Sequence, residues 1–183
     1  MAGYLRNPWV TFLRQYGPVA NNDSLYDEHI ASAARRAKVR PLRFDTGGVL
    51  EELIENFNDE QPRSVVLTGT AGDGKTFLCR EVWSALGGAA SVWDGNEKVR
   101  ELTLRHGARL VVIKDLSELT VDESPLLAPM ADAMFVLRPR AVYLVAANDG
   151  QLRQAWERVP DSELVVAARK FIDHRSCRPA ARV

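Results

Sequence analysis

The residues with the clearest chemical potential form one short run of the sequence. Residues 69–76 match the pattern G-x-x-x-x-G-K-[ST]; in order they are Gly69, Thr70, Ala71, Gly72, Asp73, Gly74, Lys75 and Thr76. Glycines let successive backbone N–H groups turn inward around phosphate oxygens, and a following helix adds the positive end of its dipole. Lys75 would supply a mobile charge for the β- and γ-phosphates of a nucleotide, and the Thr76 hydroxyl would ligate Mg²⁺. The alternative explanation is an ordinary glycine turn.

A carboxylate that could complete such a site follows a second apolar run. Residues 109–113 are mostly apolar and lead through Lys114 into Asp115. Ligands of parallel α/β sheets bind outside the carboxyl ends of the strands, so Asp115 would emerge at the same edge as residues 69–76. There it could hold Mg²⁺ through water. A solvated aspartate at a strand end is the alternative.

Alternating strands and helices should position these residues. Apolar runs predict buried strands, and a 3.6-residue periodicity predicts helices. We predict strands at 65–68, 90–93, 110–114 and 142–146, and helices at 24–38, 48–58, 75–86, 97–106, 127–135 and 151–158. This rhythm is typical of an α/β fold, a three-layer α/β/α sandwich with a mostly parallel sheet covered on both faces. The run 69–76 then lies between a strand and a helix, as its mechanism requires.

The composition indicates one globular domain. Of the 183 residues, 46% are hydrophobic and 26% are charged, far from the composition of disordered chains. We expect a helical extension over 1–43, a core over 44–170 and an irregular tail over 171–183. The net charge of zero excludes a general basic field for holding nucleic acid.

Localisation and cysteine chemistry are also bounded by the sequence. No apolar run approaches the ~20 residues needed to cross a bilayer, and polar residues interrupt the first ten positions, so we expect neither a membrane span nor a secretory signal. A cytoplasmic location follows as an expectation. Cys79 and Cys177 are the only cysteines, which argues against a disulfide framework or a zinc site.

Taken together, the motifs resemble the core of P-loop NTPases of the AAA+ type over about residues 44–160. Residues 69–76 correspond to the Walker A motif, and Asp115 resembles the Walker B carboxylate. Many such ATPases place a catalytic glutamate directly after that aspartate, whereas here Leu116 follows and Glu118 comes three residues after Asp115. Glu118 could act as general base for an attacking water, or the protein could bind ATP and hydrolyse it slowly. Both alternatives stay open.

Asn148 ends the apolar run 141–147 and resembles the sensor-1 position of these ATPases, where an amide orients the attacking water. Asn148-Asp149-Gly150 is also a strong loop signal, and asparagine can cap the following helix. Arg153 and Arg158 resemble arginine-finger candidates, although a solvated helix face explains them more simply.

The family resemblance also implies an architecture and partners. It implies a strand order 5-1-4-3-2, with Leu164 to Ala167 as the candidate fifth strand, and then a helical lid. Only 35 residues follow Asn148, so we expect a truncated ATPase without the lid. The shorter strings at 67–76, 113–119 and 146–151 are similar to ATPases of bacterial DNA-defence systems, including the ATPase subunit of phosphorothioation-dependent restriction. That similarity implies ATP-driven action on DNA with partner proteins.

The leading hypothesis is an ATP-binding, ATP-hydrolysing module that uses Mg²⁺ and couples nucleotide state to a protein partner, a second copy of itself or DNA. One alternative is a nucleotide-gated interaction module with little hydrolysis. Another is a small-molecule or nucleotide kinase, although 68 residues precede Gly69. The basic run 35–43 could contact DNA phosphates, but cations at a helix C-terminus also offset the helix dipole.

Overall fold

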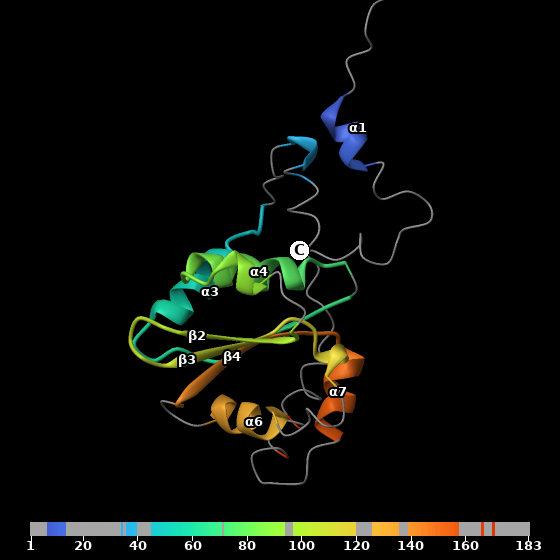
Figure 1. The fold of residues 1–183 in the computed structure, drawn as a ribbon. Coiled ribbons are helices and arrows are strands. Elements are labelled where there is room, and N and C mark those ends of the chain that lie inside the picture. Colours follow the sequence, from blue (N-terminus) through green and yellow to red (C-terminus); the bar gives the residue numbers. More distant parts are fainter. Residues whose placement is uncertain are drawn as a thin grey trace, which may run out of the picture.

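The computed structural model describes residues 7–13, 34, 36–39, 45–70, 72–93, 97–119, 126–135, 139–157, 166 and 170. Most of the predicted helix at 24–38, Ala71, Arg158 and the tail at 171–183 lie outside the described residues. The described chain is an α/β protein in which helices pack on an open four-stranded sheet (Figure 1). No helix among the described residues is long and apolar enough to span a membrane.

The sheet has the strand order β1-β4-β3-β2. Its strands are β1 (Val65–Thr68), β2 (Val99–Thr103), β3 (Arg109–Ile113) and β4 (Ala141–Ala147). Strand β4 pairs in parallel with both β1 and β3, whereas β2 pairs antiparallel with β3. The predicted mostly parallel sheet is therefore confirmed, with one antiparallel strand at its edge.

Two of our predictions are wrong in the segment that precedes β3. Residues 90–93, predicted as a strand, form the short helix α5 (Ala90–Trp93), and the predicted helix at 97–106 contains β2. A tight turn at Gly107, where φ is +90°, lets β2 pair directly with β3 as a hairpin. The alternation of Leu102 and Leu104 with polar neighbours was the missed signal, because a period of two indicates a strand.

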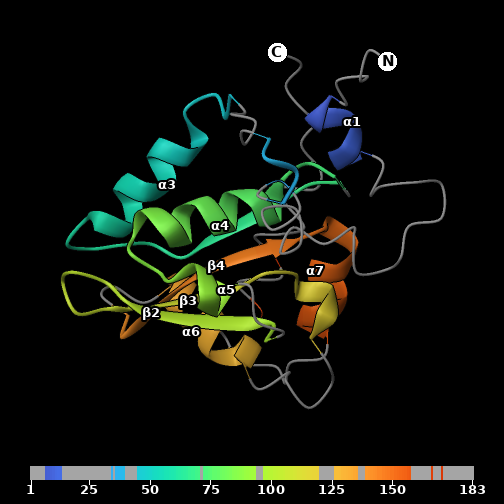
Figure 2. The same ribbon diagram turned by 45° about the horizontal axis from the view of Figure 1, so that its top comes forward.

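Helices cover both faces of the sheet because the side chains of β3 and β4 alternate between them (Figures 1 and 2). On one face Val112 and Leu144 pack with α3 (Val49–Asn58), α4 (Lys75–Ala85) and α5. On the other face Val111 and Val145 pack with α6 (Leu127–Phe135) and α7 (Asp149–Glu157). The central strand β4 is almost wholly buried between these two clusters.

The structure also describes parts of the expected helical extension over 1–43 and of the candidate fifth strand at 164–167. Within 1–43 the structure describes the short helix α1 (Pro8–Leu13), where Phe12 packs with Ala34 and Val39 in a small separate cluster. Val166, the one described residue of the candidate fifth strand at 164–167, is helical. The expected strand is therefore wrong at that position.

Candidate functional site

Three parallel strands end at one edge of the sheet, and each is followed by a candidate site residue. The pairing aligns Thr68 of β1 with Ala147 of β4, and Ile113 of β3 with Val145 of β4. Residues 69–76 follow β1, Asn148 follows β4, and Lys114 and Asp115 follow β3. The fold therefore gathers these segments at the carboxyl edge, where α/β sheets bind ligands.

Residues 69–76 form the turn between β1 and α4. Helix α4 begins at Lys75, and its N-cap Gly74 is left-handed with φ of +77°. Gly72 also has a positive φ, +89°. A Cβ at either glycine would meet no atom within 4 Å, so the backbone conformation is what requires glycine there. The strand and helix predicted on either side of this loop are both present.

The loop is held by hydrogen bonds that converge on Thr70. The Lys75 Nζ donates to the Thr70 carbonyl at 2.6 Å, and the Thr70 hydroxyl donates to Asp73 Oδ1 at 2.8 Å. The Thr70 amide donates to Asp73 Oδ2 at 2.5 Å. These bonds from Thr70 lower the pKa of the exposed Asp73 carboxyl below its ordinary value. Since the Thr70 amide is already engaged, it contributes to the shape of the loop.

The start of α4 lies against the end of β3. The Thr76 hydroxyl donates to the carbonyl of Lys114 at 3.4 Å, which brings it next to the residue that precedes Asp115. Asp115 Oδ1 accepts hydrogen bonds from the Ser117 amide at 2.8 Å and from the Ser117 hydroxyl at 2.6 Å. These bonds fix the carboxylate at the N-cap of a short 3-10 helix, η3 (Leu116–Glu118).

Thr76 and Asp115 are the residues at this edge that could contribute oxygen ligands to a metal ion. Among the described residues no group of three or more His, Cys, Asp or Glu could hold a metal. One hydroxyl and one carboxylate at the same edge are the sparse oxygen ligands that Mg²⁺ accepts when substrate phosphates and water fill its other positions. Thr76 and Asp115 supply that pair.

Glu118 lies one 3-10 turn after Asp115 and is exposed. Its amide donates to the Asp115 carbonyl at 3.2 Å, and its own carbonyl accepts a hydrogen bond from Lys98 Nζ at 2.6 Å. Sequence reasoning missed Lys98, because its partner is twenty residues away and no local pattern connects them. The turn that carries Glu118 is thus tied to the start of β2.

Asn148 caps the next helix. Its side-chain oxygen accepts a hydrogen bond from the Gln151 amide at 2.8 Å, and its carbonyl accepts one from the Leu152 amide at 2.9 Å. The capping interpretation is therefore confirmed. Because the cap engages the side-chain oxygen of Asn148, the Nδ2 group is the part of this side chain that could donate a hydrogen bond to a water molecule. Arg153 is exposed on the same helix, α7.

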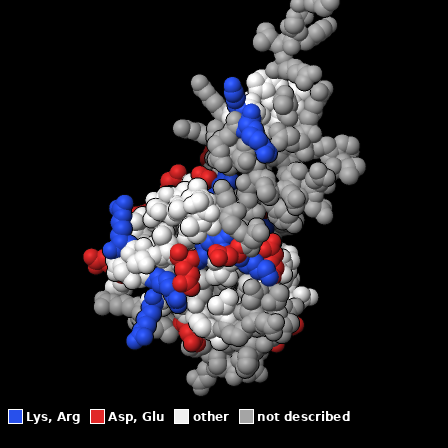
Figure 3. All heavy atoms as spheres, viewed as in Figure 1, with Lys and Arg blue, Asp and Glu red and all other residues white. Residues whose placement is uncertain are grey.

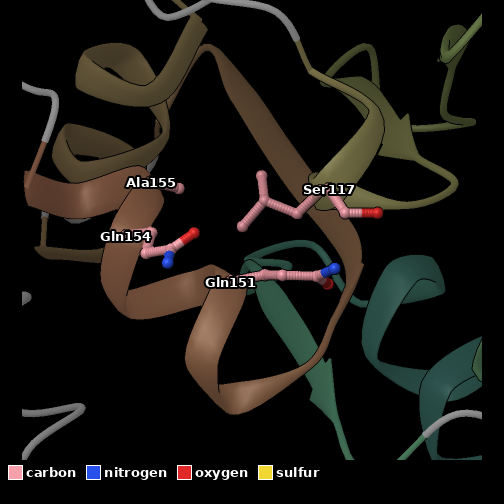
Figure 4. Close-up of a pocket in the computed structure, with 5 residues that line it drawn as sticks. Ser117, Gln151, Gln154 and Ala155 are labelled. Atoms are coloured by element: carbon pink, nitrogen blue, oxygen red, sulfur yellow. The ribbon is translucent and has the colours of Figure 1, made fainter.

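A small hollow opens between η3 and α7 (Figure 4). Its volume is about 130 Å³, and its lining residues are Leu116, Ser117, Gln151, Gln154 and Ala155. Since one liquid water occupies ~30 Å³, the hollow has room for a few waters or one small side chain but not a nucleotide.

Lys114 is a buried cation that the sequence did not mark as unusual. It is 6% exposed, its Nζ donates to the Trp93 carbonyl at 2.6 Å, and the ammonium lies 4.9 Å from the centre of the Trp93 ring. The lysine stem packs in the apolar cluster while its charge meets the carbonyl and the ring. This contact fixes the main chain directly before Asp115.

Surface charge can be followed on one face of the molecule. On the face in Figure 3, basic and acidic side chains of the described residues are interspersed. Comparison with known proteins adds no assignment: no family model matches the chain, and no curated protein or solved structure matches it.

Proposed function

We propose that the protein is an ATP-binding and ATP-hydrolysing P-loop module with an AAA+-like three-layer α/β/α core. One observation carries the proposal: a loop with two left-handed glycines joins β1 to α4, Lys75 opens that helix, and the Thr76 hydroxyl reaches the main chain beside Asp115. This arrangement offers a cation, a helix N-terminus and two oxygen ligands at a single edge.

Each of these groups has a role toward the triphosphate. The amides at the start of α4 would donate to phosphate oxygens, and the Lys75 ammonium would move from the Thr70 carbonyl to the β- and γ-phosphates. Thr76 and Asp115 would hold Mg²⁺, which when bound neutralises phosphate charge. Glu118 would accept the proton of the attacking water, and the Asn148 Nδ2 group would orient that water.

Nucleotide binding is tested most directly by substitution of Lys75. Because Lys75→Ala removes the charge that contacts the phosphates, we expect ATP with Mg²⁺ to raise the melting temperature of the wild-type protein but not of this variant. Calorimetry should give at least about a hundredfold weaker ATP binding, as expected for a lost charge-assisted contact of ~3 kcal/mol.

Lys170→Ala is the matched control, since Lys170 is exposed and follows the described core. It should bind ATP like the wild type. Unchanged ATP affinity in Lys75→Ala would contradict the proposed site. GTP and ADP titrated in parallel would define the nucleotide preference.

The exposed position of Glu118 favours a second candidate function, a nucleotide-gated interaction module that binds ATP and scarcely hydrolyses it. Glu118 lies on a 3-10 turn three residues after Asp115, not directly after it, and its side chain is exposed to solvent. In this alternative, bound ATP acts as a structural ligand that changes how the carboxyl edge meets a protein partner or DNA.

Single-turnover hydrolysis distinguishes the two functions. If Glu118 is the base, Glu118→Gln should slow hydrolysis about 10²- to 10⁴-fold while ATP affinity is retained, because only proton transfer is lost. Asp132→Asn, a change at an exposed carboxylate of α6, is the control and should leave the rate unaltered. Equal rates in the wild type and Glu118→Gln, with ATP binding intact, would favour the gated module.

A further inference from the structure

The candidate phosphate loop contains a carboxylate that the motif does not require. Asp73 stands at a variable position of the pattern, yet both of its carboxylate oxygens accept hydrogen bonds from the same residue, Thr70. The Asp73 amide completes a turn by donating to the Thr70 carbonyl at 3.4 Å. The Asp73 side chain and amide thus hold Thr70 and Asp73 together.

The neighbouring glycine leaves room for this closure. A Cβ built on Gly69 would collide with the Asp73 carboxylate, so the side chain lies directly over the end of β1. Gly69 therefore accommodates Asp73, whereas Gly72 and Gly74 serve the backbone conformation. The requirement for glycine therefore has a steric cause at Gly69 and a conformational cause at Gly72 and Gly74.

Thr70 is held by Lys75 and by Asp73, and a bound nucleotide would affect these two contacts differently. The bond from Lys75 Nζ to the Thr70 carbonyl would be given up when the ammonium turns toward phosphate. The bonds from Thr70 to Asp73 use a side chain and an amide that the proposed phosphate contacts do not need. They can therefore hold the loop both before and after binding.

We propose that Asp73 is a positioning residue that holds the phosphate loop in its curled form through Thr70, before a nucleotide arrives. The inference rests on the proposed function and deepens it. A loop that is ordered in advance loses less conformational entropy on binding, so the bracing strengthens affinity. A carboxylate near phosphates also repels them, and this repulsion would act in the opposite direction. The sign of the mutational effect therefore separates bracing from repulsion.

Two variants and one control test the inference. Asp73→Ala removes both acceptors, whereas Asp73→Asn removes the charge but retains an oxygen for the Thr70 amide. Asp59→Ala is the matched control, because the exposed Asp59 likewise accepts a hydrogen bond from a nearby amide, that of Gln61, at 2.7 Å in another loop. Hydrogen exchange at the Thr70 amide is measured in the nucleotide-free proteins, and ATP affinity is measured by calorimetry.

If Asp73 holds the loop in place, the Thr70 amide should exchange about tenfold faster in Asp73→Ala, and ATP should bind about tenfold more weakly, because a lost charge-assisted hydrogen bond has about this effect. Asp73→Asn should restore most of the exchange protection and most of the ATP affinity. Asp59→Ala should change neither. Unchanged exchange at Thr70 in Asp73→Ala overturns the inference, and so does tighter ATP binding by both Asp73 variants. If the wild-type protein binds no ATP, the proposed function fails, and the exchange measurement alone decides whether Asp73 braces the loop.

Discussion

Lys75 and Lys114 lie at the same edge of the sheet in opposite environments. Lys75 is half-buried at the first position of α4, and its Nζ donates to the Thr70 carbonyl, whereas Lys114 is buried against the carbonyl and ring of Trp93. The sequence singled out Lys75, because its spacing from two glycines is a local pattern. It did not single out Lys114, because the residue that receives its charge is 21 positions away.

Cys79 on α4 offers a test of how this helix packs against the sheet. The thiol is 0% exposed, and burial raises its pKa from 9.0 to about 12. At pH 8 only about one thiol in ten thousand would be ionised, so attack by the thiolate is suppressed. In a Cys177→Ser variant, we expect the disulfide reagent DTNB to label Cys79 slowly in the folded protein and at once in 6 M guanidinium.

The same pKa shift predicts a pH dependence. Because the unfolded chain ionises its thiol near pH 9 and the folded chain near 12, the contribution of Cys79 to stability is complete below pH 9 and falls as the pH rises toward 12. Rapid labelling of the folded protein at pH 8 would contradict the burial of this thiol.

At the scale of elements, the strand–loop–helix unit followed its sequence closely, whereas the segment between α4 and β3 did not. Strand β1 and helix α4 begin at the predicted residues, since an apolar run, glycines and an amphipathic helix are all local signals. Residues 97–106, which contain β2, were predicted as a helix within an alternation of strands and helices. Pairing with β3 along five residues makes part of this segment a strand instead.

The cap of α7 gives a prediction at this scale. Asn148→Ala removes the acceptor for the Gln151 amide, so we expect a loss of about 1 kcal/mol in the free energy of unfolding, measured with urea. Asn148→Asp keeps an acceptor at the helix N-terminus and should unfold like the wild type. Equal stability of Asn148→Ala and the wild type would show that the cap contributes nothing to stability.

Slower ATP hydrolysis in Asn148→Asp at unchanged stability would support the separate role of the Nδ2 group.

At the scale of the whole molecule, the position of β4 decides how the site is assembled. Strand β4 comes last of the strands along the chain but lies between β1 and β3, so it places Asn148 between residues 69–76 and Asp115. Helix α4, which follows β1, and helix α6, which follows β3, pack on opposite faces of the sheet (Figure 2). This crossing of connections is what brings residues 69–76, 115 and 148 to one edge.

Local spacing was enough to locate the loop, the helix that begins at Lys75 and the acid at the end of β3, because each depends on residues within one or two turns of chain. The antiparallel direction of β2, the burial of Lys114 and the contact of Thr76 with β3 depend on segments that meet only when the chain folds. Their energies come from long-range pairing and from the exclusion of water, and neither leaves a periodic trace in the sequence. Asp73 is a different case: its partner Thr70 is only three residues away, but the motif accepts any residue at this position, so the contact became visible only in the structure.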